Sequence, residues 1–148
     1  MGNQPRLTFR SARWLSFTSA PTYGVSVKTL DERVIGYVAL SPYRKGRRAF
    51  SHTCEISYYL FSGYRGRGFG KELVRTALSA AREAGFETAI AIILGCNLRS
   101  IRLLEGFGFS VCGTIPNAAC LDGTRIDHVY LALDLTRAGA LLTAPGTT

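Results

Sequence analysis

A glycine-rich hexamer places the strongest constraint on how this chain can fold. Residues 65–70 read Arg-Gly-Arg-Gly-Phe-Gly and stand between an apolar, strand-like run and a strongly amphipathic segment. Because glycine has no side chain, backbone N–H groups at these positions can approach an anion closely. A following helix adds the positive end of its dipole, and Arg65, Arg67 and Lys71 add full charges. The pattern predicts a loop that binds a pyrophosphate.

The familiar nucleotide-binding loops do not match this spacing. The glycines are wrongly spaced for a dinucleotide-binding fingerprint, although Glu87 stands at roughly the distance of its acidic residue. A P-loop would continue with Gly-Lys and then Ser or Thr, whereas Gly70 and Lys71 are followed here by Glu72. Taken alone, the hexamer also fits a plain glycine-rich turn before a helix.

Two motifs follow one another along the chain. Arg65, Gly68 and Gly70 fit the pattern Arg/Gln-x-x-Gly-x-Gly/Ala. Further on, Asn97 and Ser100 fit Asn-x-x-Ser and lead to a Gly-Phe pair at 108–109. In this order the two motifs resemble those of the GNAT family of N-acetyltransferases.

Shorter stretches resemble one branch of that family, the phosphinothricin and methionine sulfoximine acetyltransferases. They are His-Thr-Cys-Glu at 52–55, Ser-Ile-Arg-Leu at 100–103, and Asp127. One departure is Arg125, which stands where this branch usually has tryptophan. The resemblance extends from about Tyr23 to Leu135, which is most of the chain.

The resemblance implies an α/β (α+β) fold with a mixed, mostly antiparallel sheet, splayed at two central strands and flanked by helices. The strand and helices that usually open this fold are shortened here. Residues 1–22 are expected to form an irregular lead-in, with room for one short helix near 11–17, and residues 136–148 a flexible tail. Hydrophobic periodicity predicts strands over 23–28, 34–40, 53–61, 88–94, 109–115 and 126–135, and helices over 71–84 and 97–106.

The composition is that of one globular domain over residues 1–148. Hydrophobic residues make up 47% of the chain and charged residues 19%, which suits a single core and excludes general disorder. No apolar run reaches the length of a membrane helix, and the first ten residues lack the apolar centre of a secretory signal. We therefore expect a cytoplasmic location and no membrane partner.

The net charge of +8 raises the alternative of a nucleic-acid partner. The basic residues are scattered, however, and are densest at residues 44–48. No aromatic residues alternate with basic ones as in proteins that bind single strands. An anionic cofactor explains the charge more simply, so we expect no nucleic acid.

The four cysteines, at 54, 96, 112 and 120, lack the spacing of metal ligands. We expect no metal, and we expect these thiols to be reduced and mostly buried. Cys54 stands two residues from His52 but fits a small buried apolar residue better than a nucleophile.

The resemblance implies that acetyl-CoA is the co-substrate. The edge of the third predicted strand would pair with the pantetheine amides, and the glycine loop would hold the pyrophosphate. Asn97 would contact the pantetheine arm, although it could equally be a simple helix cap. The residues expected to bind the cofactor are Tyr58, Tyr59, Leu60, Arg65, Gly66, Arg67, Gly68, Phe69, Gly70, Lys71, Asn97 and Ser100.

Glu55 is the expected catalytic base, because it aligns with the glutamate that takes the proton of the amine in the resembling branch. The alternative is a strand carboxylate that pairs with an arginine. A backbone N–H at Tyr58 or Tyr59 would stabilise the developing oxyanion.

Many relatives use a tyrosine to protonate the leaving thiolate, and the phosphinothricin branch often has histidine there. This chain has Leu104 at that position, which cannot donate a proton. His128, Tyr130 and His52 are the candidate replacements, unless each is only a packed residue.

For the acceptor, the sequence supports a class of molecule. Arg48 and Phe50 lie where the resembling branch forms part of its substrate pocket, and an arginine can hold a carboxylate. We expect the acceptor to be the primary amine of a small molecule, such as an amino acid or an analogue. A homodimer is expected because relatives often dimerise. The alternative function is a catalytically lapsed module that binds acyl-CoA.

Overall fold

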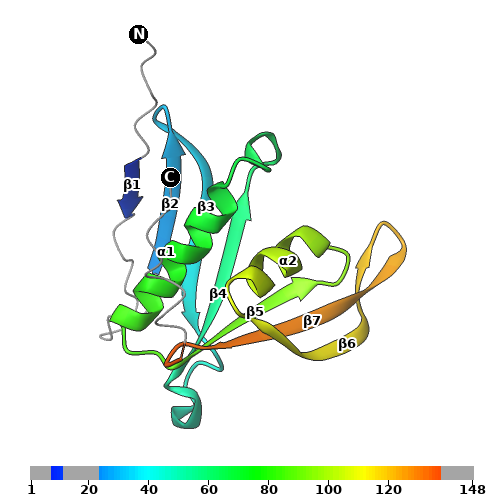
Figure 1. Ribbon diagram of the computed structural model, residues 1–148. Coiled ribbons are helices and arrows are strands. Elements are labelled where there is room, and N and C mark those ends of the chain that lie inside the picture. The colour runs from blue at the N-terminus through cyan, green and yellow to red at the C-terminus, as the bar shows by residue number, and fades with distance from the viewer. Residues whose placement is uncertain (1–7, 12–23, 138–148) are drawn as a thin grey trace.

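Seven strands form one sheet, and both α-helices of the described residues lie on the same face of it (Figure 1). The computed structural model of the chain describes residues 8–11 and 24–137. The strand order is β1-β2-β3-β4-β5-β7-β6, and only β4 and β5 pair in parallel. The strands are β1 Thr8–Ser11, β2 Gly24–Leu30, β3 Arg33–Pro42, β4 Thr53–Leu60, β5 Thr88–Leu94, β6 Ser110–Leu121 and β7 Thr124–Asp134.

The first strand lies inside the segment expected to be irregular. Residues 8–11 form β1, which pairs antiparallel with the outer edge of β2. Four residues are too few to show a hydrophobic period, so the sequence alone gave no sign of this strand. The rest of the expected lead-in, the expected short helix beyond Ser11 and most of the expected tail lie outside the described residues.

The two helices cover the sheet with the apolar stripes expected from their periodicity. Helix α1, Phe69–Glu83, buries Leu73, Val74, Ala77, Leu78 and Ala81, and Gly85 follows its end with a φ of 83°. Helix α2, Leu98–Gly106, begins at Asn97. Both helices join the main core against β3, β4, β5 and β7, where each fully buried large aliphatic side chain contributes roughly 1.5–3 kcal/mol.

The two central strands separate part-way along their length. β4 and β5 are paired only from Thr53 with Thr88 to Glu55 with Ile90. β4 nevertheless stays paired with β3 as far as Leu60, and β5 stays paired with β7 as far as Leu94. Figure 1 shows the two strands diverging beyond this point. The structure thus confirms the expected splay, and it leaves the facing backbone edges without strand partners.

The hairpin of β6 and β7 is longer than the sequence predicted. β6 has twelve residues rather than ending at 115, because an irregularity between Ile115 and Ala119 takes up Pro116 and Asn117. The backbone N–H of Asn117, whose φ is 53°, donates to Asp127 Oδ1 at 2.9 Å. Asp127 therefore has a structural role in this hairpin.

None of the helices formed by residues 24–137 is long and apolar enough to cross a membrane.

Candidate functional site

The glycine loop presents backbone N–H groups that the helix does not use. Gly66 and Gly68 have φ angles of 77° and 85°, which side-chain-bearing residues rarely adopt. Helix α1 starts at Phe69, and the N–H of Glu72 donates to Gly68 O at 3.3 Å. The N–H groups of residues 69–71 precede this bond and have no acceptor within the helix. No side chain caps this end, so the loop is open to an anion.

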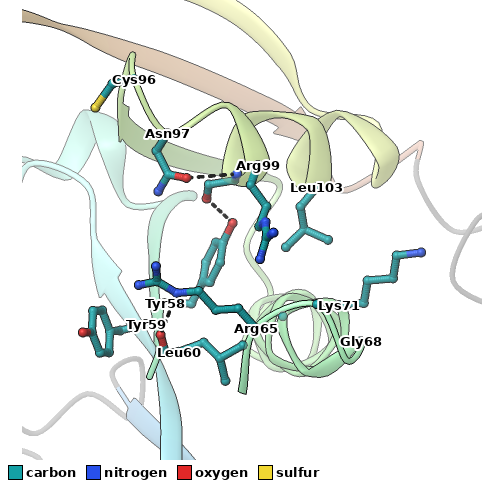
Figure 2. A pocket seen from close by; sticks show the side chains of 13 residues that line it. Tyr58, Tyr59, Leu60, Arg65, Gly68, Lys71, Cys96, Asn97, Arg99 and Leu103 are labelled. Carbon is teal, nitrogen blue, oxygen red and sulfur yellow. Dashed lines mark hydrogen bonds between the residues drawn. The ribbon is translucent and has the colours of Figure 1, made fainter. Parts of the chain in front are cut away.

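A cleft of about 810 Å³ lies in front of this loop, between the free edge of β4 and the first turns of α2. Figure 2 shows the side chains of β4, the loop and α2 facing one another across it. Such a volume suits a small-molecule or cofactor site. The lining residues are Tyr58, Tyr59, Leu60, Arg65, Gly66, Gly68, Gly70, Lys71, Cys96, Asn97, Arg99, Ser100 and Leu103.

Arg67 and Phe69, two loop residues expected to bind the cofactor, do not line the cleft. The Phe69 side chain is buried in a second small cluster with Leu30 and Ile35, so only its backbone can serve an anion. Arg67 is exposed, and its guanidinium lies 5.3 Å from the Phe69 ring centroid and 6.0 Å from that of Tyr64. Phe69 is the first residue of α1 and lies four residues before the buried Leu73, so helical spacing could have indicated its burial; Arg67 lies in the loop, which has no regular face.

The direction of the backbone along β4 decides which groups face the cleft. The N–H of Phe61 donates to Ile35 O on β3 at 2.9 Å. Because N–H groups alternate in direction along a strand, those of Tyr58 and Leu60 point to the parted side, and that of Tyr59 points to β3. The ring of Tyr59 lies on the face away from α2, stacked on Tyr37 with 6.1 Å between centroids.

A hydrogen-bonded chain joins the two sides of the cleft. The Tyr58 hydroxyl shares a hydrogen bond with the buried hydroxyl of Ser100, and the Ser100 N–H donates to Asn97 Oδ1 at 3.2 Å (Figure 2). Asn97 is thus a helix cap, as its position before α2 predicted. Burial raises the pKa of Tyr58, and the bond to Ser100 opposes this, so the phenol is protonated at neutral pH.

The cations of the site have different environments. Arg65 crosses the cleft and donates from Nε to Leu60 O at 3.3 Å, so it already engages a backbone group of the free edge. Arg99 and Lys71 also line the cleft and are exposed. In Figure 2 Arg99 points toward Arg65, while Lys71 extends away from Tyr58. Together they make the cleft attractive to an anion.

Glu55 marks the point where the two central strands part. It is the last β4 residue paired with β5 and is partly buried. Burial raises the pKa of its carboxyl group, and the charge of His128 opposes this shift. Side chains alternate along β4, so Glu55 faces the side of the sheet opposite to Tyr58. A carboxylate with a raised pKa beside a cleft is suited to exchange protons.

Arg48 and Phe50 do not join the cleft described above. They form a short 3-10 helix, η1 Arg48–Phe50, and both are exposed. Phe50 makes an edge contact with Tyr43, with 5.5 Å between ring centroids. This segment precedes the end of β4 that carries Glu55.

Three lining residues were missing from the sequence-based set: Cys96, Arg99 and Leu103. Leu103 lies three residues after Ser100 and four after Arg99 on α2, so its side chain neighbours both of theirs on the helix surface. Leu103 also packs close to the glycine loop, since its Cδ2 would lie 3.2 Å from a Cβ placed at Gly70. Helical spacing from Ser100 was a signal that could have found Leu103.

Cys54 and Leu104 belong to the core. Both are fully buried. Burial raises the pKa of the Cys54 thiol to about 12, so the thiol is not a nucleophile at neutral pH. The expectation that the cysteines are mostly buried was wrong, because Cys96, Cys112 and Cys120 are exposed at the cleft rim and on β6. Among the described residues no cluster of His, Cys, Asp and Glu could hold a metal ion.

Comparison with known proteins places this geometry in a family. Residues 3–109 match the sequence model of the acetyltransferase (GNAT) family. YwnH of Bacillus subtilis (strain 168) is 37% identical over 91 residues, which are 62% of this chain and 56% of that protein. The L-methionine sulfoximine/L-methionine sulfone acetyltransferase of Salmonella typhimurium is 29% identical over 122 residues, 82% of this chain and 71% of that protein. The chain thus spans between 56% and 71% of the length of these two relatives.

Solved structures share the fold. The phosphinothricin acetyltransferase Pat of Sinorhizobium meliloti, in complex with acetyl-CoA, is 33% identical with a TM-score of 0.72 over 83% of this chain and 65% of that one. YncA of Salmonella typhimurium with acetyl-CoA is 30% identical, also with a TM-score of 0.72, over 76% of this chain and 65% of that one. With a family match across most of its length and this shared sheet, the chain belongs to the acetyltransferase (GNAT) family.

Proposed function

We propose that the chain transfers an acetyl group from acetyl-CoA to the primary amine of a small molecule, such as an amino acid or an analogue. One observation carries this proposal: a cleft joins the open glycine loop to the parted edge of β4, and Glu55 stands where the strands separate. The class of acceptor is supported by relatives. One is named for methionine sulfoximine and methionine sulfone, and MnaT of Escherichia coli, 28% identical, is named an L-amino acid N-acyltransferase.

Successive residues along the cleft would bind successive parts of acetyl-CoA, from the pyrophosphate to the thioester. Backbone N–H groups of residues 66–71 would hold the pyrophosphate, with Arg65 and Lys71 adding charge. The backbone groups of Tyr58 and Leu60 would pair with the pantetheine amides, because they point to the parted side. Tyr58 rather than Tyr59 would then donate an N–H to the thioester carbonyl. The bound thioester would supply an acetyl group that an amine can accept.

Glu55 would act as the base. An ammonium group has no lone pair to offer, so a neighbouring group must take a proton before the amine can attack. A carboxylate with a raised pKa can do this directly or through a water molecule. The alternative role, an ion pair with an arginine, finds no support within residues 24–137, because the salt bridges there do not involve Glu55.

Tyr58 would return a proton to the thiolate. Leu104, at the position where relatives carry a proton donor, is fully buried in the core. His128 and Tyr130 lie on β7 and are not part of the cleft lining. The Tyr58 hydroxyl, in contrast, lies in the cleft beside Ser100 and is protonated at neutral pH. This assignment adds Tyr58 to the three candidates suggested by the sequence, of which His52 also lies outside the cleft lining.

Replacing Tyr58 with Phe should lower kcat by about tenfold and leave KM for acetyl-CoA within twofold of the wild-type value. The loss is expected to be moderate, below the usual range for a general acid of roughly 10²–10⁴-fold, because a thiolate is a tolerable leaving group. Steady-state kinetics would measure both constants, with Tyr37→Phe on the opposite face as the matched control. An unchanged kcat would remove Tyr58 from the reaction.

Arg48 and Phe50 remain our candidates for the acceptor site. They lie just before the end of β4 that carries Glu55, and both are exposed to an incoming molecule. The Arg48 guanidinium would bind the carboxylate of an amino acid, which fits the proposed class of acceptor. This assignment rests on their position in the chain, since they do not line the cleft.

The direct test of the function is release of free CoA from acetyl-CoA over a panel of amines, including amino acids, methionine sulfoximine and phosphinothricin. Turnover with at least one small primary amine is expected. The alternative, a lapsed module, is motivated by Leu104 and would show acetyl-CoA binding in calorimetry without turnover. Failure to bind acetyl-CoA at all would contradict both functions.

We also propose that the chain forms a homodimer through β6 and acts in the cytoplasm. β6 is an edge strand that exposes Val111, Ile115 and Leu121 by 49%, 48% and 47%, and such an edge readily pairs with a second copy. The exposed free cysteines suit a reducing compartment.

Light scattering on the purified chain should therefore give the mass of a dimer. Ile115→Lys should shift the mass toward the monomer, because it places a charge on the exposed apolar edge. Val34→Lys, which places the same charge on an equally exposed apolar residue of β3, is the charge-matched control. A monomeric mass for the unmodified chain at all concentrations would exclude the dimer.

A further inference from the structure

A buried lysine lies beneath the first turn of α1. Lys28, on β2, is 1% exposed, and its ammonium forms an ion pair with the carboxylate of Glu72. Lysine is almost never buried to this extent unless its charge is paired. Glu72 is the one acidic residue in the first turn of α1, and its side chain is 31% exposed. The pair therefore connects the edge half of the sheet to the helix end that carries the glycine loop.

The same lysine also contacts a residue inside the loop. Its Nζ lies 5.6 Å from the ring centroid of Phe69, which stands between Gly68 and Gly70. Leu30 and Ile35 pack against this ring, and Arg67 lies over it from the loop. The backbone of the loop is thus fixed to the sheet through one aromatic side chain that contacts two cations.

Glu72 creates an electrostatic problem for an anion-binding loop. A carboxylate in the first helical turn is favourable for the free helix, because it interacts with the positive end of the dipole. A pyrophosphate bound at the same end would be repelled by that carboxylate. The Lys28 ammonium neutralises Glu72 from the buried side, where solvent screens little.

We propose that Lys28 is a positioning residue for the phosphates of the donor: it neutralises Glu72, so that the glycine loop accepts a pyrophosphate. This inference rests on the proposed use of acetyl-CoA. It assigns a binding role to a residue that lies outside both family motifs and outside the cleft lining.

The test compares acetyl-CoA with acetyl-pantetheine, which has the same thioester but no pyrophosphate. Lys28→Met keeps an unbranched side chain of nearly the same length and removes its charge. We expect KM for acetyl-CoA to rise about tenfold, the effect of one partly screened like charge, with kcat unchanged. The value of kcat/KM for acetyl-pantetheine should stay the same. Lys45→Met, in the exposed loop before β4, removes the same charge elsewhere. It should leave KM for acetyl-CoA and kcat/KM for acetyl-pantetheine unchanged.

A second substitution isolates the charge of Glu72. In the double variant Lys28→Met/Glu72→Gln no unpaired carboxylate remains, so KM for acetyl-CoA should return to within about twofold of the wild-type value. If Lys28→Met alone does not fold, Lys28→Gln carries the test, because its amide can still donate to Glu72 while its charge is gone, and KM for acetyl-CoA should rise in the same way. A tenfold loss of acetyl-CoA affinity in the double variant would overturn the proposal.

Two further results would also overturn it. One is an unchanged KM for acetyl-CoA in folded Lys28→Met, and the other is an equal loss with acetyl-pantetheine, which would indicate a general structural role. These outcomes differ from a failure of the proposed function, in which the wild-type chain itself neither binds nor turns over acetyl-CoA.

Discussion

Glu55→Gln is expected to lower kcat for acetyl transfer by roughly 10²–10⁴-fold, the usual contribution of a positioned general base. Glutamine keeps the size and hydrogen-bonding capacity of the side chain but cannot accept a proton from the amine. Because Glu55 stands at the parting of β4 and β5 and not in the glycine loop, binding of acetyl-CoA should be preserved. Thiol release would measure the rate, and calorimetry the binding.

The pH dependence gives an independent check on the same residue. Burial raises the pKa of Glu55 above 4.5, so the carboxylate is lost at a higher pH than in an exposed glutamate. kcat should therefore fall as the pH decreases through this raised pKa, and Glu55→Gln should not show that fall. Glu105→Gln, an exposed residue of α2, should behave as wild type. A Glu55→Gln variant with full kcat would exclude the proposed base.

Gly68→Ala is expected to weaken acetyl-CoA binding by about tenfold or more. The φ of Gly68 is 85°, and a residue with a Cβ pays roughly 1–2 kcal/mol in this region. The loop can relieve the strain only by rotating the backbone N–H groups at the start of α1, which are the proposed pyrophosphate donors. Isothermal titration with acetyl-CoA would measure the loss.

Gly63→Ala is the matched control for this substitution. Gly63 lies in the same connection, has no left-handed φ, and a Cβ there would meet nothing within 4 Å. The affinity of the Gly63→Ala variant for acetyl-CoA should stay within about twofold of the wild-type value, in line with the small effects of surface substitutions. Equal affinities in both variants would show that the conformation at Gly68 is unimportant for the donor.

Local patterns in the sequence predicted the frame of the site well. The glycine loop, the start of α1 and the Asn97 cap are each specified by residues close together in the chain, so their chemistry could be recognised directly. The splay of β4 and β5 followed from the family resemblance, and the structure confirms it. The role of Glu55 remains a prediction.

Contacts between distant residues could not be predicted in the same way. The alternation of β2 correctly predicted a strand, but its Val25 is 46% exposed while Lys28 is buried. The alternation of side chains assigns the residues of β2 to two faces, but it does not say which face a helix will cover. Here α1 covers the face that carries Lys28. The pairing of Tyr58 with Ser100 likewise depends on tertiary packing across the cleft.

An amide-resolved NMR titration of the chain with acetyl-CoA tests most directly whether the glycine loop binds the donor. If the glycine loop holds the pyrophosphate, the largest changes should occur at the N–H groups of Gly66, Gly68 and Gly70. The amides of Gly46 and Gly123, which also have positive φ but lie in other loops, should stay unchanged. If saturating acetyl-CoA leaves the resonances of these three amides unshifted, the glycine loop does not bind the pyrophosphate.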